Sequence, residues 1–245
     1  MTTTRSTTEI GPARVFGLAV RGPAHRSARR PCEDAWRGTL FPDGACIAIS
    51  DGLGSHVEAA RGSRSAVASA TKSFREWRRY RGVEPVWLLR LLEARWRLSV
   101  APARPSDCAA TCLLGGWTVE TGLVAAALGD GVMLLCEAGN PPRVLSARPT
   151  GHALDETRAL GTDHRLTDWT VFLLQPVAPW ALILATDGVA DDLVPEKLGE
   201  FTSWLLDELG NLPPKIRQAR LREALENWPT PGHSDDKTIA VLLSS

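Results

Sequence analysis

Apolar residues along the chain follow two periods, one typical of strands and the other of helices. Short apolar runs bounded by Gly, Pro, Asn or Asp indicate strands. Longer segments with apolar residues at helical spacing and charged residues on the opposite face indicate helices. We expect strands over residues 15–20, 44–50, 110–114, 123–128, 132–136, 169–174, 181–185 and 238–243, and helices over 58–80, 84–100, 196–209 and 214–228.

The order of these elements favours one fold class. Strands come in runs and helices in pairs, which is typical of antiparallel sheets covered by separate helices rather than of alternating βαβ units. We therefore expect an α+β protein. The basic segment 21–31 carries too many Arg, Pro and Gly residues for a regular element, so we expect a loop there. We expect residues 1–12 to be a disordered tail and residues 13–245 to form a single domain.

Composition excludes several function classes. The 245 residues are 44% hydrophobic, and 28 Lys and Arg balance 28 Asp and Glu, so no net charge attracts nucleic acid or an acidic membrane. No uncharged apolar stretch reaches the roughly 18 residues that a bilayer span needs, so we expect a cytoplasmic protein. The five cysteines lack the paired short spacings of a zinc site, which favours free thiols.

Acidic residues recur where the expected strands begin or end. Three aspartates stand in Asp-Gly pairs, and a Glu-Asp pair follows the basic segment directly. A single Asp-Gly pair is more often an ordinary turn, so only the joint arrangement points to a site. The acidic residues at these positions are Glu33, Asp34, Asp51, Asp130, Asp187 and Asp235.

Carboxylates gathered at one edge of a sheet have a specific chemical consequence. They repel one another and lose hydration, so they stay ionised together only if cations neutralise them. A donor set made of oxygen selects Mg²⁺ or Mn²⁺ rather than zinc. Two such ions about 3.5–4 Å apart can activate a shared water for attack at phosphorus. The pattern therefore predicts phosphoester hydrolysis.

Five motifs in this order resemble those of the metal-dependent PPM (type 2C) protein phosphatases. The resemblance spans about residues 15–243 and implies two antiparallel β-sheets sandwiched between pairs of α-helices, with metals in a cleft at one edge. The motifs are Cys32-Glu33-Asp34-Ala35-Trp36, Ile49-Ser50-Asp51-Gly52-Leu53-Gly54-Ser55-His56, Leu128-Gly129-Asp130-Gly131, Leu184-Ala185-Thr186-Asp187-Gly188-Val189 and Ser234-Asp235-Asp236-Lys237-Thr238.

The resemblance implies a ligand set for the first metal. Asp51 would bridge two metals, and the carbonyl of Gly52 would bind one of them. Asp187 and Asp235 would complete the first site, with Asp236 as the alternative to Asp235.

Other positions would hold the second metal and the phosphate. Glu33 and Asp34 would bind the second metal, largely through water. Asp130 would help to hold a third metal, although Gly131 replaces the serine that usually follows it. Arg29, four residues before Glu33, would bind the phosphoryl group as a catalytic residue, because a planar guanidinium matches two phosphoryl oxygens.

The expected activity is that of a Mg²⁺- or Mn²⁺-dependent phosphatase acting on phosphoserine or phosphothreonine. The partner would be a protein phosphorylated by a Ser/Thr kinase, with no nucleic acid or membrane involved, and the protein would be a monomer. Two alternatives stay open: a phosphatase of a small phosphorylated metabolite, and a catalytically silent scaffold that binds phosphoproteins. His25 and His56 are candidates for the group that protonates the leaving alcohol.

Overall fold

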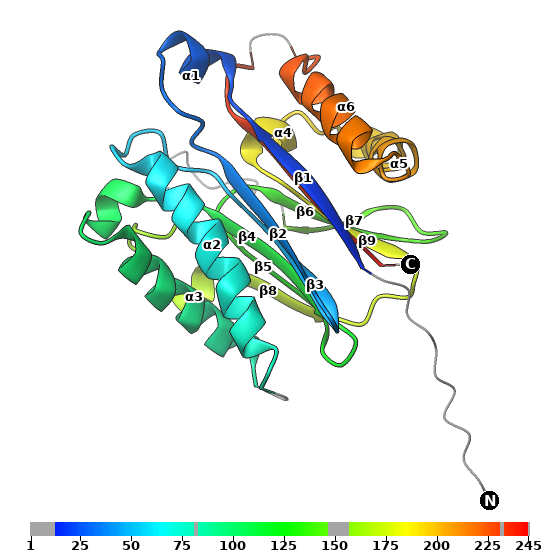
Figure 1. The fold of residues 1–245 in the computed structure, drawn as a ribbon, viewed down its shortest axis with the longest axis horizontal. Helices are drawn as coiled ribbons and strands as arrows, with labels where there is room; N and C mark the ends of the chain where they lie inside the picture. The colour runs from blue at the N-terminus through cyan, green and yellow to red at the C-terminus, as the bar shows by residue number, and fades with distance from the viewer. Residues whose placement is uncertain (1–12, 81–82, 147–156, 231–232, 245) are drawn as a thin grey trace, which may run out of the picture.

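Two five-stranded antiparallel sheets lie face to face at the centre of the protein (Figure 1). The computed structural model describes residues 13–80, 83–146, 157–230 and 233–244. The first sheet has the strand order β1 (Arg14–Val20), β10 (Lys237–Ser244), β9 (Trp180–Ala185), β6 (Val132–Glu137) and β7 (Arg143–Ser146). The second has the order β2 (Ala35–Phe41), β3 (Gly44–Ser50), β4 (Cys112–Thr118), β5 (Gly122–Leu128) and β8 (Thr170–Leu174).

Helices cover the outer face of each sheet (Figure 1). The long helices α2 (Ala59–Trp77) and α3 (Pro85–Val100) pack on the second sheet through buried side chains such as Phe74 and Trp96. The first sheet is covered by α4 (Asp187–Ala190), α5 (Leu198–Ser203), a π-helix (Trp204–Leu209) and α6 (Pro214–Glu226). A short helix, α1 (Pro23–Ser27), and the 3₁₀ turns Pro105–Cys108, Leu166–Asp168 and Pro195–Lys197 complete the regular elements.

This architecture confirms the expected α+β class and the sandwich of two sheets between helices. A buried layer between the sheets, with Ile47, Leu113 and Leu182 fully buried, joins them. The uninterrupted apolar runs of β3, β4, β5 and β9 follow from this position, because each of these strands is buried on both faces.

Three local expectations need correction. The strand expected over 110–114 begins at Cys112 and runs to Thr118, and the helix expected over 196–209 is divided into a 3₁₀ turn, α5 and the π-helix. The segment 21–31 contains α1, whose proline lies in its first turn, where a missing N–H costs nothing.

Strands β2 and β7 were not expected from the sequence. Both are edge strands that leave side chains exposed, so neither shows a continuous apolar run. The tail expected over residues 1–12 lies outside the described residues.

The topology brings the acidic motifs to one edge of the sandwich. Ala35 pairs with Ser50, so the start of β2 lies beside the end of β3, and Glu33-Asp34 therefore neighbours Asp51. Ile239 pairs with Ala185 in the other sheet, so the start of β10 lies beside the end of β9. None of the helices in the described residues is both long and apolar enough to cross a bilayer.

Candidate metal centre

Asp51 and Gly52 are fixed by backbone contacts at the end of β3. The Asp51 N–H donates to Thr111 Oγ1 at 2.9 Å, and the Thr111 N–H donates to the Asp51 carbonyl at 2.8 Å. The Gly52 N–H donates to the Glu33 carbonyl at 3.1 Å. A Cβ at Gly52 would lie 2.6 Å from the Ala59 carbonyl oxygen, so only glycine fits between this turn and α2.

Thr186 connects the two sheets beside these carboxylates. Its hydroxyl donates to Asp34 Oδ2 at 2.8 Å and accepts the Thr238 N–H at 3.1 Å. Asp34 is 5% exposed and Thr186 is 1% exposed. The threonine therefore fixes the Asp34 carboxylate from the opposite sheet, in a place that water hardly reaches.

The electrostatics show that the expected carboxylates act on one another. Burial raises the pKa of Asp34 to about 7. Burial, followed by the charges of Asp34, Asp187 and Asp235, raises the pKa of Asp51 well above its ordinary value. Burial and the charges of Asp130 and Asp235 raise the pKa of Asp187 to about 6. The five aspartates thus form one electrostatic cluster. Within the described residues, however, no group of three or more His, Cys, Asp or Glu side chains is arranged so that it could hold a metal ion.

Two buried oxygens of this cluster have no hydrogen-bond partner. They are Oε2 of Glu33 and Oδ1 of Asp34, and their residues are 4% and 5% exposed. A buried carboxylate oxygen without a donor is unfavourable unless a cation compensates its charge. The expected donors are carboxylate and carbonyl oxygens, the type of ligand that suits Mg²⁺ or Mn²⁺.

Asp130 lies at the turn between β5 and β6, as expected. Its Oδ2 accepts a hydrogen bond from Thr157 Oγ1 at 3.0 Å, and its charge acts on Asp187. Asp130 therefore belongs to the same edge of the sandwich as the other aspartates.

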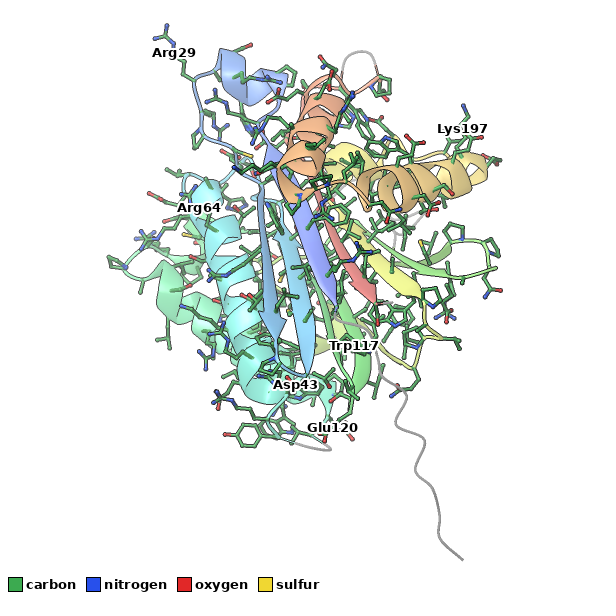
Figure 2. The ribbon with its side chains drawn as sticks, turned by 45° about the vertical axis from the view of Figure 1, so that its right-hand side comes forward. Arg29, Asp43, Arg64, Trp117, Glu120 and Lys197 are labelled. Carbon is green, nitrogen blue, oxygen red and sulfur yellow. The ribbon has the colours of Figure 1, made fainter. Side chains whose placement is uncertain are left out.

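The structure does not bring Arg29 to the carboxylates. Arg29 has a positive φ of 56° and is exposed, and its side chain points away from the body of the protein (Figure 2). The neighbouring Arg30 takes that place instead. Its Nη2 donates to Glu33 Oε1 at 2.6 Å and to the Gly54 carbonyl at 3.2 Å.

The two candidate histidines also differ in whether they reach the carboxylates. His25 Nδ1 lies 2.9 Å from Asp236 Oδ2, and His25 Nε2 lies 3.6 Å from Glu33 Oε2. His56 instead contacts a backbone carbonyl, with Nδ1 2.5 Å from Ser106 O. Of the two candidates, His25 is therefore the one beside the acidic cluster.

Asp236 has a position quite different from that of Asp235. Asp235 is exposed and acts electrostatically on Asp51 and Asp187, whereas Asp236 is 1% exposed and accepts backbone N–H groups of the N-terminal loop. Burial alone would raise the pKa of Asp236, but hydrogen bonds from the N–H groups of Gly22 and Glu33 and the contact with His25 lower it below its ordinary value. Both oxygens of Asp236 are thus occupied by backbone N–H groups, whereas the side chain of Asp235 is exposed.

Thr111 and Thr186 were not expected to belong to the site, and Asp236 was expected only as the alternative to Asp235 as a metal ligand. Thr186 and Asp236 stand directly beside acidic residues of the motifs, which was the available signal. Thr111 stands in an apolar segment that contains no such signal.

The sequence profile described as protein phosphatase 2C matches residues 21–226. The chain belongs to the protein phosphatase 2C family. This assignment confirms the resemblance drawn from the five motifs, and it makes the chain a phosphoprotein phosphatase. No curated protein matches the sequence.

Solved structures of protein phosphatases share the fold at low sequence identity. The catalytic domain of the serine/threonine phosphatase PstP, in complex with two manganese ions, is 20% identical, with a TM-score of 0.62 over 95% of this chain and 98% of that one. The serine/threonine phosphatase of S. agalactiae is 16% identical, with a TM-score of 0.66 over 94% and 99%. RsbX in complex with magnesium is 12% identical, with a TM-score of 0.60 over 97% and 99%. At these identities the likeness establishes the fold.

A sizeable cavity in this phosphatase lies away from the acidic cluster. It has a volume of about 820 Å³ and is lined by residues such as Glu137, Trp180, Thr202 and Ser244. Trp180 begins β9 and Ser244 ends β10, whereas Asp187 follows β9 and Asp235 precedes β10. The cavity is therefore at the opposite end of the first sheet and shares no residue with the carboxylates.

Proposed function

We propose that this chain is a Ser/Thr phosphoprotein phosphatase that depends on two Mg²⁺ or Mn²⁺ ions, with a third ion at Asp130. The observation that carries the proposal is the pair of buried, unpartnered oxygens on Glu33 and Asp34 beside Asp51, whose pKa is raised by burial and neighbouring carboxylates. A family member with this donor set is suited to hard divalent ions.

The proposed ligands divide between the two sheets. Asp51 would bridge the two ions and the Gly52 carbonyl would bind one of them, together with Asp187 and Asp235. Glu33 and Asp34 would hold the second ion. When bound, the ions would supply a water of lowered pKa and neutralise the charge of the phosphoryl group.

For the phosphate-binding arginine, the geometry favours Arg30 over Arg29. Arg30 touches Glu33 with one N–H group, and its guanidinium has further N–H groups that can donate to phosphoryl oxygens. Arg29 could bind the phosphate only if its side chain turned inward. Its role as the phosphate-binding residue is therefore supported only by the resemblance of the sequence motifs.

The test compares a phosphothreonine peptide with p-nitrophenyl phosphate, each with Mn²⁺, Mg²⁺ or EDTA. We expect turnover of both substrates that EDTA abolishes and Mn²⁺ restores. Asp51→Asn should abolish turnover, whereas Asp43→Asn, which changes an exposed carboxylate at the far end of the sheets (Figure 2), should not. Turnover of a small phosphorylated metabolite but not of the peptide would favour the metabolite phosphatase. No turnover with any divalent ion, together with retained binding of the phosphopeptide, would favour the scaffold.

A further inference from the structure

The loop that carries Glu33 and Asp34 has almost no apolar support. It runs from the end of β1 at Val20 to the start of β2 at Ala35, and its helix α1 contains no buried residue. Burial of apolar surface usually fixes a loop against the body of a protein. Polar contacts must therefore hold this one.

Asp236 supplies the contacts at both ends of the loop. Its Oδ1 accepts the Gly22 N–H at 2.6 Å, and its Oδ2 accepts the Glu33 N–H at 2.6 Å. Oδ2 also lies 3.4 Å from the Asp34 nitrogen and 2.9 Å from His25 Nδ1. One buried side chain at the start of β10 thus contacts the loop where it begins and where it ends.

The backbone beside Asp236 packs tightly on the beginning of the loop. A Cβ at Gly22 would lie 2.3 Å from the Asp235 carbonyl oxygen, so a larger residue does not fit. The Ala24 N–H donates to the Ser234 carbonyl at 3.0 Å. The residues before β10 and the loop after β1 therefore form one interlocked unit.

We propose that Asp236 is a positioning residue that holds Glu33 and Asp34 in their metal-binding place by clamping the loop to the start of β10. This inference rests on the proposed function, because it assumes that Glu33 and Asp34 bind a metal ion. Asp236 is not itself a ligand in this scheme, because its oxygens are occupied by backbone N–H groups.

The chemistry of the clamp requires a carboxylate. Both oxygens of Asp236 accept hydrogen bonds, one from Gly22 and the other from Glu33. An asparagine has one oxygen and one NH₂ group, so one backbone N–H would face another donor. Asp236→Asn preserves the size of the side chain but removes one of the two contacts.

The first measurement is amide hydrogen exchange of residues 21–34 in the metal-free protein, which needs no activity. We expect exchange in Asp236→Asn to be about tenfold faster or more, since a buried donor loses its acceptor. Asp43→Asn is the matched control, because it makes the same change on an exposed residue, and its loop should exchange like the wild type.

The second measurement is the Mn²⁺ concentration that half-saturates turnover, together with direct Mn²⁺ binding by calorimetry. We expect Asp236→Asn to raise both the half-saturating Mn²⁺ concentration and the Mn²⁺ dissociation constant by about tenfold or more, the range for residues that orient metal ligands. At saturating Mn²⁺, kcat should recover most of its value. Gly22→Ala disturbs the same contact from the loop side and should give the same pattern, which keeps the test decisive if Asp236→Asn does not fold.

Three outcomes would overturn the clamp. Unchanged exchange in Asp236→Asn would mean that the loop is held elsewhere. Faster exchange with unchanged Mn²⁺ affinity would mean that the clamp does not serve the metal. Weaker Mn²⁺ binding with unchanged exchange would make Asp236 a ligand. Failure of the proposed function is distinct from these, since the wild-type protein itself would then show no Mn²⁺-dependent turnover.

Discussion

Thr186→Val isolates the contribution of one hydroxyl group to the site. Valine keeps the shape of threonine but can neither donate to Asp34 Oδ2 nor accept the Thr238 N–H, the two hydrogen bonds of 2.8 and 3.1 Å. Because Thr186 is 1% exposed, water does not easily replace either partner.

The expected loss of stability follows from the hydrogen bonds that Asp34 and the Thr238 N–H no longer make. A hydrogen bond to a charged group contributes about 1.5–3 kcal/mol, and a buried N–H without an acceptor costs about 1–3 kcal/mol. Both effects come from one hydroxyl, so they overlap, and we expect the free energy of unfolding to fall by about 2–4 kcal/mol. The Mn²⁺ concentration for half-maximal turnover should rise by about tenfold to a hundredfold, because Asp34 loses the group that orients it.

The assay is urea unfolding in EDTA, followed by the fluorescence of the nine tryptophans, and then Mn²⁺ titration of turnover. Thr186→Ser retains the hydroxyl and serves as the control. The reasoning is refuted if Thr186→Val loses less than about 0.5 kcal/mol, the scatter of an inconsequential substitution. It is equally refuted if Thr186→Ser loses as much as Thr186→Val.

Three further outcomes are expected. In EDTA, the protein should lose stability as the pH rises from about 4 to about 7, because over this range the folded state keeps protons on Asp187 and Asp34 that the unfolded state has lost. Saturating Mn²⁺ should remove this loss in thermal unfolding. Asp51→Asn should lower kcat by several orders of magnitude, and combining it with Asp187→Asn should add little; fully additive losses in kcat would contradict a shared site. Arg30→Ala should raise KM for a phosphothreonine peptide by about tenfold to a hundredfold, the loss of a hydrogen bond to a charged group, and Arg29→Ala should change it little, whereas the reverse result would return the role to Arg29.

The sequence by itself determined the fold class and predicted the acidic residues of the site. Strands buried on both faces, such as β3 and β9, must be apolar throughout, and helices that cover a sheet must be apolar on one side, so both patterns are visible locally. The acidic motifs are also visible locally, since aspartates such as Asp51 and Asp187 stand beside turn-forming glycines at strand ends.

The tertiary structure decided which side chains meet. The edge strand β2 has no strong pattern of its own and exists because it pairs with β3. The backbone of the basic loop turns Arg29 outward and leaves Arg30 on Glu33, a difference of one residue that spacing alone does not determine. Asp235 and Asp236 are neighbours in the chain, yet one is exposed and the other is buried under backbone N–H groups from a segment more than 200 residues away. Such roles depend on hydrogen-bond partners that only folding brings together.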